Sequence, residues 1–284
     1  MFRTNALKQR LKKGGRAFGV FADLGHPPVA EILAASGYDC VLIDREHGLG
    51  DIASSVAEMT AAQAYGCTAL MRVPANDPVV LKLALDLGVE GVMIPAINDA
   101  AEAKRAAASC AYPPKGIRGF AAAIVRASSY GVRIEEYLAR ARDELLVIGQ
   151  IESRAGVENA DAIAATQGID MIFIGPYDLS NSLGYPGEPD HPQALKAIAR
   201  VEKAAKKRGK WLGAIPTPAR SAAELYKAGY DLVLSHCDVV MLRDAARADV
   251  AAMRQVLGRD KGKKSGAAGK GGFFGATGAK SKKK

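Results

Sequence analysis

The sequence predicts an α/β fold in which eight parallel strands close into a (β/α)8 barrel, the TIM barrel. The chain has 284 residues. One such barrel typically needs about 250, although this length also suits two smaller domains. Strand-like and helix-like segments alternate from residue 16 to residue 257. Because strand–helix–strand crossovers make neighbouring strands parallel, this alternation favours the barrel, with an open doubly wound sheet as the competing architecture.

The strands are predicted from eight short apolar segments rich in β-branched residues, the pattern of strands buried on both faces. They span residues 17–21, 39–43, 68–73, 91–94, 145–150, 170–174, 211–215 and 231–234. Ala-rich amphipathic segments lie between them, with capping side chains at several starts and glycines at several ends. Examples span residues 51–65, 78–87, 99–110, 134–142, 156–166, 192–208 and 221–228. The connection over residues 112–133 is long for this fold, and long ordered loops are usually functional.

The positive charge of the chain is concentrated at its C-terminal end. The net charge is +9, but residues 259–284 hold nine Lys or Arg and one Asp, so the preceding residues are nearly neutral. We therefore expect a catalytic barrel domain over residues 1–258 and a disordered Lys/Gly-rich tail over residues 259–284, too poor in apolar residues to fold. A basic tail can attract polyanions weakly. A tail-mediated polyanion-binding protein is thus the non-enzymatic alternative, with no specific nucleic acid as a partner.

Cysteine spacing and hydropathy bear on the compartment. The four cysteines are dispersed and form no C-x-x-C pair, which fits a reducing compartment and argues against a thiolate metal site. Residues 1–16 contain no apolar stretch of a secretory signal. No apolar run approaches the roughly 20 residues of a membrane span. We expect a cytoplasmic protein that has no membrane partner.

Polar side chains follow several of the predicted strands. In a β/α barrel the active site lies at the carboxyl ends of the strands. The second strand is followed by Asp44, Arg45, Glu46 and His47, the third ends at Arg72, the fifth leads to Gln150 and Glu152, and the sixth to Tyr177 and Asp178. The first, fourth and eighth strand ends offer less, namely Asp23, Pro95 and Ser235-His236. Such a gathering of polar residues at one rim predicts a reactive site there.

Glu152 and Asp178 are the candidate metal ligands. Their hard anionic oxygens, without a Cys or paired His nearby in the sequence, point to Mg²⁺ or Mn²⁺, completed by waters and substrate oxygens. The alternative is that each carboxylate caps a helix, and Asp178 could do both. The segment from Gly175 to Tyr177 could present backbone N–H groups to a substrate carboxylate at a helix start.

Arg72 and His47 are the candidate catalytic side chains. The planar guanidinium of Arg72 matches a carboxylate or an enolate oxygen, and its alternative role is a structural ion pair with an acid on a neighbouring strand. His47 carries an imidazole, a side chain that could move a proton. A lone histidine is more often structural, but His47 follows a strand in a cluster with Asp44 and Glu46.

At these residues the chain resembles the HpcH/HpaI aldolase family of class II pyruvate aldolases, whose members include enzymes for 4-hydroxy-2-oxoheptanedioate and 2-dehydro-3-deoxyglucarate. Six segments carry the resemblance in family order over about residues 15–257. They are LIDREH at 42–47, RVPANDP at 72–78, YPPKGIRG at 112–119, RAS at 126–128, QIE at 150–152 and IGPYDLS at 174–180. The resemblance implies a barrel, a divalent metal ion (Mg²⁺ or Mn²⁺, with Co²⁺ as a further option) and a homohexamer that exchanges its last helix between subunits.

The resemblance also implies roles for individual residues. His47 would be the catalytic base, Arg72 would stabilise the enolate, and Glu152 and Asp178 would be the metal ligands. Asp86 matches an acid that in the family comes from a neighbouring subunit and raises the basicity of the histidine. The residues alone would make Asp86 a solvated helix position.

Contacts with the keto acid would come from Gln150, Asp178 and the backbone of Tyr177. The chain departs from its closest relatives at Arg45, where a small residue is common, at Tyr177, where alanine is common, and in residues 211–217. These departures concern substrate identity and leave the reaction class unchanged.

The function expected from the sequence is a metal-dependent aldolase that reversibly cleaves a 4-hydroxy-2-keto acid to pyruvate and an aldehyde through an enolate. No predicted strand ends in lysine, which disfavours Schiff-base chemistry. The alternatives are a citryl-CoA or malyl-CoA type lyase, for which no CoA site is evident, and an oxaloacetate decarboxylase, which passes through the same enolate.

Overall fold

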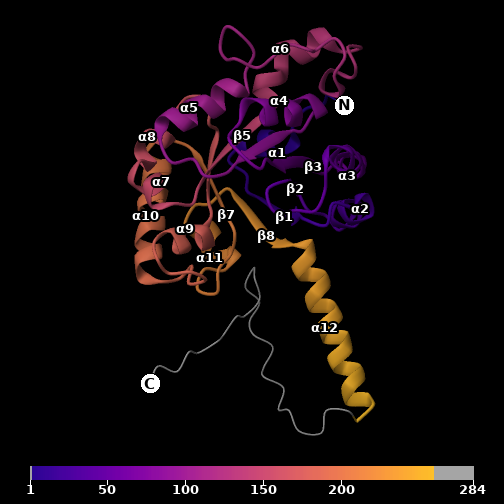
Figure 1. Cartoon of the computed structure of the whole chain (residues 1–284), viewed down its shortest axis with the longest axis vertical. Helices are drawn as coiled ribbons and strands as arrows, with labels where there is room; N and C mark the ends of the chain where they lie inside the picture. The colour runs from indigo at the N-terminus through magenta and orange to yellow at the C-terminus, as the bar shows by residue number, and fades with distance from the viewer. Residues whose placement is uncertain (1, 259–284) are drawn as a thin grey trace.

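The structure of the protein is a computed structural model that describes residues 2–258. In this part of the chain eight parallel strands close into a barrel in chain order, β1 to β8 (Figure 1). The strands are β1 (Ala17–Ala22), β2 (Cys40–Asp44), β3 (Thr68–Arg72), β4 (Gly91–Ile94), β5 (Leu146–Ile151), β6 (Met171–Ile174), β7 (Trp211–Ala214) and β8 (Leu232–Cys237). The predicted barrel is confirmed, and the open sheet is excluded. The predicted tail lies outside the described residues.

Helices pack around the barrel, except that the last helix, α12 (Asp238–Val256), projects away from it (Figure 1). They are α1 (Ala6–Lys12), α2 (Pro27–Ala35), α3 (Ile52–Ala64), α4 (Pro78–Leu87), α5 (Ala100–Ser109), α6 (Ile134–Glu144), α7 (Arg154–Glu158), α8 (Ala160–Ala164), α9 (Pro176–Ser182), α10 (Pro192–Lys207), α11 (Ala222–Lys227) and α12 (Asp238–Val256), with a 3-10 turn at Arg126–Ser128. Asp51 and Ser221 form capping boxes at the starts of α3 and α11, and Gly88 ends α4 in the left-handed conformation. Among residues 2–258, no helix combines the length and apolarity needed to cross a bilayer.

One predicted helix is wrong in its extent. Residues 156–166 were expected to form a single helix, but they belong to two short helices, α7 and α8, that meet at Asn159. The Asn159 backbone leaves the helical region there, with φ −97° and ψ 8°. Its side-chain amide donates to the Asn98 carbonyl at 2.9 Å. This long-range hydrogen bond ties the junction of α7 and α8 to the segment that follows β4.

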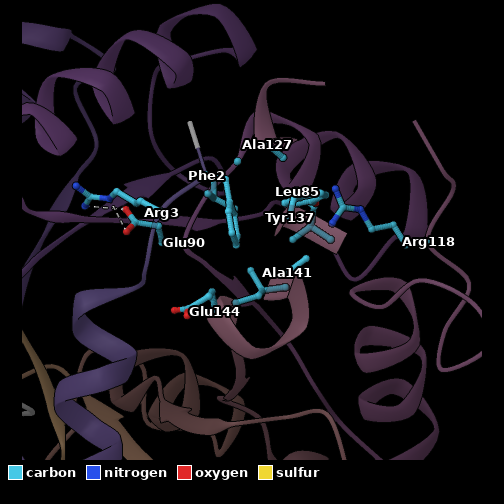
Figure 2. A pocket seen from close by; sticks show the side chains of 12 residues that line it. Phe2, Arg3, Leu85, Glu90, Arg118, Ala127, Tyr137, Ala141 and Glu144 are labelled. Atoms are coloured by element: carbon cyan, nitrogen blue, oxygen red, sulfur yellow. Dashed lines mark hydrogen bonds and ion pairs between the residues drawn. The ribbon is translucent and has the colours of Figure 1, made fainter. Parts of the chain in front are cut away.

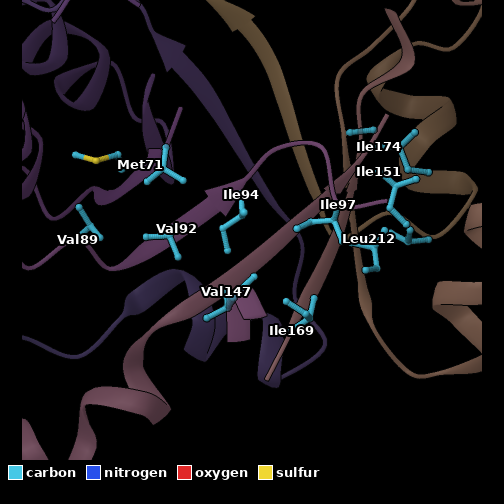
Figure 3. Close-up of a cluster of buried hydrophobic side chains, with 14 of the residues drawn as sticks. Met71, Val89, Val92, Ile94, Ile97, Val147, Ile151, Ile169, Ile174 and Leu212 are labelled. Carbon is cyan, nitrogen blue, oxygen red and sulfur yellow. The ribbon is translucent and has the colours of Figure 1, made fainter. Parts of the chain in front are cut away.

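Two apolar layers hold the fold together. The interior of the barrel is filled by side chains such as Leu42, Leu70 and Phe173. A second layer lies between the strands and the helices and includes Val92 and Val147 (Figure 3). The four cysteines are buried and unpaired, as predicted. With both faces covered, the strands can be apolar throughout, so a polar residue at a strand end has to be explained by something other than exposure.

The N-terminal segment closes the end of the barrel where the strands begin. Leu7 and Leu11 of α1 belong to the interior layer. The fully buried Asn5 caps α1 by accepting from the backbone N–H of Lys8 at 2.9 Å. Its amide donates to the carbonyls of Glu90 at 2.6 Å and Glu144 at 2.9 Å. One side chain therefore joins α1 to the starts of β4 and β5.

A small cavity of about 40 Å³ lies at this same end (Figure 2). Phe2, Glu90, Tyr137 and Glu144 are among the residues that line it. It can hold a few water molecules at most. It is too small for a keto acid, and it lies at the end opposite to the predicted site.

Replacing Asn5 with alanine should lower the free energy of unfolding by about 2–4 kcal/mol, since a helix cap is lost and two buried carbonyls lose their donors. Urea denaturation of Asn5→Ala and of the wild type would measure this. Asn181→Ala on the exposed face of α9 is the matched control, with an expected change below about 0.5 kcal/mol. Equal stabilities of Asn5→Ala and the control would contradict the role of Asn5.

Candidate active site

A cavity of about 340 Å³ opens at the carboxyl ends of the strands. It is lined by Phe21, Asp23, Asp44, His47, Arg72, Gln150, Phe173, Gly175, Tyr177, Asp178, Ile215 and Cys237. Five predicted site residues therefore lie around one cavity: His47, Arg72, Gln150, Tyr177 and Asp178. Glu152, the predicted partner of Asp178, lies beside it and hydrogen-bonds to Gln150.

Arg72 is held rigidly at the cavity wall. Asp44 and Arg72 are register partners at the ends of β2 and β3, and Arg72 Nε donates to Asp44 Oδ1 at 2.9 Å while Nη2 donates to Oδ2. Arg72 Nη1 also lies 3.1 Å from Glu46 Oε2, and the guanidinium stacks 5.0 Å from the Phe21 ring centroid. Burial works to raise the pKa of Asp44, but the hydrogen bond and charge of Arg72 outweigh it and hold this pKa below its usual range. The ion pair weighed as the alternative for Arg72 is present, and it orients a guanidinium that still faces the cavity.

His47 stands at the edge of the cavity. Its side chain is 67% exposed, and its Nε2 lies 3.9 Å from Glu46 Oε2. Burial raises the pKa of Glu46, with a further contribution from the Asp178 carboxylate. Glu46 thus lies between the imidazole of His47 and the guanidinium of Arg72. An imidazole in this position can exchange a proton with a ligand in the cavity and with solvent.

Glu152 is oriented from two sides. Its Oε1 accepts from the backbone N–H of Ala96 at 2.9 Å, and its Oε2 accepts from Gln150 Nε2. Ala96 has a φ of 52°, which is strained for a residue with a side chain. A Cβ at Gly175 would lie 2.7 Å from Glu152 Oε2 and 2.9 Å from Gln150 Nε2, so only glycine fits against this pair.

The acids at this side of the cavity suit a divalent cation. Burial, together with the charges of Asp178 and Glu46, raises the pKa of Glu152 to about 7. Gln150 Oε1 is buried without a hydrogen-bond partner among the described residues. Within residues 2–258, no group of three or more His, Cys, Asp or Glu side chains forms a complete metal cage. Glu152 and Asp178 would therefore hold a hard cation only with oxygens from water or substrate, which is common for Mg²⁺.

Asp86 lies apart from this cavity. It is near the end of α4, and its Oδ1 accepts from Arg118 Nη2 at 2.7 Å. Arg118 comes from the long connection over residues 112–133 and stacks 4.6 Å from the Tyr112 ring centroid. Within the described chain, Asp86 is thus engaged by Arg118 and does not line the cavity that His47 borders.

The three departures from the family pattern fall in different places. Arg45 points away from the cavity, donates from its Nε to Ser55 at 2.7 Å and pairs with the buried Glu58. Tyr177 and Ile215 do line the cavity. Only the latter two departures can alter contacts with a substrate directly.

Asp23 is a polar lining residue for which the sequence predicted no role. It follows β1, and burial, together with the charges of Asp44 and Asp238, raises its pKa to about 6. Asp238 is 215 residues away in the chain, and its carboxylate accepts from the backbone N–H of Asp23 at 3.0 Å. The only signal in the sequence was an acid directly after a buried strand.

The raised pKa of Glu152 predicts how the stability of the metal-free protein varies with pH. Glu152 in the folded protein keeps its proton up to about pH 7, whereas the unfolded chain releases it near 4.5. The folded state therefore binds more protons between these values, so stability falls as pH rises. We expect metal-free Glu152→Gln to gain about 2–3 kcal/mol relative to the wild type between pH 5 and pH 8. Denaturant titrations in EDTA across this range would measure the difference, and parallel curves would contradict the buried, protonated Glu152.

Comparisons with known proteins place the chain in a family. The profile of the family described as HpcH/HpaI aldolase/citrate lyase matches residues 17–245. The hydroxypyruvate/pyruvate aldolase of Chromohalobacter salexigens is 39% identical over 239 residues, 84% of this chain and 93% of that protein. The 4-hydroxy-2-oxo-heptane-1,7-dioate aldolase of Escherichia coli is 35% identical over 244 residues, 86% of this chain and 93% of that protein.

Solved structures agree with this assignment. A HpcH/HpaI aldolase/citrate lyase family protein from Burkholderia cenocepacia superimposes with a TM-score of 0.83 at 37% identity, covering 88% of this chain and all of that one. Structures of citrate lyase type share 13–17% identity and show the fold alone. The profile match and the relatives at 35–39% identity show that the chain belongs to the HpcH/HpaI aldolase/citrate lyase family.

Proposed function

We propose that the protein is a class II, divalent-metal-dependent aldolase that reversibly cleaves a 4-hydroxy-2-keto acid to pyruvate and an aldehyde. The observation that carries this proposal is the barrel-mouth cavity, where Glu152, Asp178 and the unpartnered oxygen of Gln150 lie near one oriented guanidinium, that of Arg72. Relatives named as pyruvate or hydroxypyruvate aldolases support the same reaction.

The residues that would hold the ion are Glu152 and Asp178, with Mg²⁺ or Mn²⁺ as the expected metals and Co²⁺ as a further option. When bound, the ion would supply Lewis-acid polarisation of the keto acid carbonyl. The paired acids fit this use because burial and the charges of Asp178 and Glu46 raise the pKa of Glu152 to about 7, and a cation would favour its ionised form.

The cleavage step assigns roles to the side chains of the chain itself. His47, directly or through a water, takes the proton of the C4 hydroxyl. The C4–O electrons form the aldehyde carbonyl as the C3–C4 bond breaks, and the bond electrons pass to the enolate of pyruvate. Arg72, already oriented by Asp44, stabilises the negative charge that develops on the enolate oxygen. Proton transfer to C3 then completes pyruvate.

Positioning of the keto acid falls to Gln150, Asp178 and the backbone of Tyr177. Phe21 and Phe173 contribute apolar wall to the same cavity, which limits water near the enolate.

A homo-oligomer, a hexamer by family resemblance, would bring Asp86 of a second copy to His47. Residues 1–258 would form the catalytic barrel of a cytoplasmic enzyme, and residues 259–284 a tail outside its chemistry. Oxaloacetate decarboxylation would use the same residues because it yields the same enolate.

Chelation should abolish cleavage. Incubation with EDTA is expected to stop pyruvate release from a 4-hydroxy-2-keto acid, and Mn²⁺ or Mg²⁺ should restore it. Pyruvate can be followed by its reduction with lactate dehydrogenase and NADH. Titration calorimetry with Mn²⁺ on the metal-free wild type, Glu152→Gln and Asp178→Asn should show binding to the wild type alone. Full activity in EDTA would rule out the metal route.

Replacing Arg72 with lysine should lower kcat by about 10²–10³, because lysine cannot present the fork that faces the developing enolate charge. Steady-state kinetics of cleavage would measure this. Arg142→Lys is the matched control, since Arg142 pairs with Asp170 at the opposite end of the barrel. It should cost stability but leave kcat per folded molecule within about twofold. Similar kcat values for both variants would remove Arg72 from the mechanism.

A further inference from the structure

Asp23 lines the cavity from the end of β1, and the proposed chemistry gives it no part. Its backbone is fixed on both sides, because its N–H donates to Asp238 Oδ1 at 3.0 Å and its carbonyl accepts from Leu49 N–H at 2.7 Å. The Cys237 thiol, a weak donor, hydrogen-bonds to the carboxyl group of Asp23. Asp23 Oδ1 is buried without a hydrogen-bond partner among the described residues. A buried polar atom in that condition is rare in native proteins and calls for a ligand or another explanation.

The position of Asp23 in the ring of strands says which end of a substrate it would meet. β1 lies between β8 and β2, whereas Glu152 and Asp178 follow β5 and β6, on the other side of the closed barrel. A keto acid held by its carboxylate and C2 carbonyl near Glu152 and Asp178 therefore extends its C4 end toward β1 and β2. His47, which follows β2, lies on that same side. Asp23 accordingly faces the aldehyde portion of the substrate.

The charged groups around Asp23 determine which kind of aldehyde can bind at this end of the cavity. Asp44 and Asp238 lie close enough to Asp23 for their charges to disfavour its ionisation. Of the described residues that line the cavity, Arg72 is the one permanent cation, and Asp44 and Glu46 already engage it. A carboxylate on the aldehyde would meet several acids and no free cation. A hydroxyl group, in contrast, can donate to the carboxyl of Asp23.

We propose that Asp23 is a specificity residue that selects an uncharged, hydroxyl-bearing aldehyde by hydrogen bonding to its hydroxyl group and by repelling aldehydes that carry a carboxylate. The inference rests on the proposed aldolase function and names the class of its second substrate. It gives Asp23 contact with the aldehyde and assigns it no proton transfer.

Aldol addition of pyruvate to three two-carbon aldehydes tests the proposal. Glycolaldehyde carries a hydroxyl, acetaldehyde carries none, and glyoxylate carries a carboxylate. In Asp23→Ala the ratio of kcat/KM for glycolaldehyde to that for acetaldehyde should fall at least about tenfold, the effect of one hydrogen bond to a carboxylate. Asp23→Asn keeps the shape and can still hydrogen-bond, so this ratio should stay within about threefold. Its glyoxylate to acetaldehyde ratio should rise because the negative charge is gone.

Asp143→Ala, on the exposed surface of α6, is the control and should leave both ratios unchanged. A merely structural role of Asp23 would lower all three rates together and leave the ratios as they are, which overturns the proposal. If Asp23→Ala does not fold, the nearly isosteric Asp23→Asn decides, because an unchanged glyoxylate ratio contradicts the charge argument. Exchange of the pyruvate methyl protons in D2O, followed by NMR in the wild type, reports enolate formation without any aldehyde. Absence of that exchange refutes the aldolase function itself, whereas exchange with unchanged ratios refutes only the role of Asp23.

Discussion

Asp44 and Arg72 end two adjacent strands in register, and their side chains pair where the barrel opens. The mouth also gathers Asp23, Glu46 and, across the ring, further acids. Burial disfavours the ionised form of these groups and is the first cause of the raised pKa of both Asp23 and Glu46. The positive charge of Arg72 favours the ionised form of both carboxyl groups, since it lowers both pKa values. The whole arrangement of acids thus depends on one arginine held in a two-point hydrogen bond.

A buried ion pair of this kind contributes little net stability, because the cost of removing both charges from water consumes most of the Coulomb attraction. The benefit lies in orientation. Arg72 cannot rotate without breaking bonds to Asp44 and Glu46, so its charge is in place before a substrate arrives. The contacts that stabilise the fold therefore lie away from this ion pair, at the end of the barrel where the strands begin. There α1 seals the interior with Leu7 and Leu11 and satisfies buried carbonyls through Asn5.

The barrel and most of its mouth could be predicted from the sequence because their determinants are local. A short apolar run followed by a polar residue identifies both a buried strand and its carboxyl end, and this rule located Arg72, Gln150 and Glu152. This rule does not say which face of the strand each side chain occupies. The strand limits were predicted to within one residue, apart from the end of β8, which lies three residues beyond the predicted one. Limits of this accuracy do not decide which face of a strand each side chain occupies. Asp44 and Arg45 are neighbours, yet one holds Arg72 and the other points outward to Glu58.

Non-local contacts account for the rest of what the sequence could not show. The environment of Asp23 depends on Asp238, which the closure of β1 against β8 brings beside it. No spacing in the chain encodes that proximity. The same argument applies beyond a single chain: His47 is two-thirds exposed, and Asp86 is engaged by Arg118 outside the cavity. The barrel thus encloses Asp44 and the guanidinium of Arg72 and leaves Asp178 and the imidazole of His47 exposed. A group that arrives from outside the chain can therefore contact His47 without disturbing the charges that Arg72 balances.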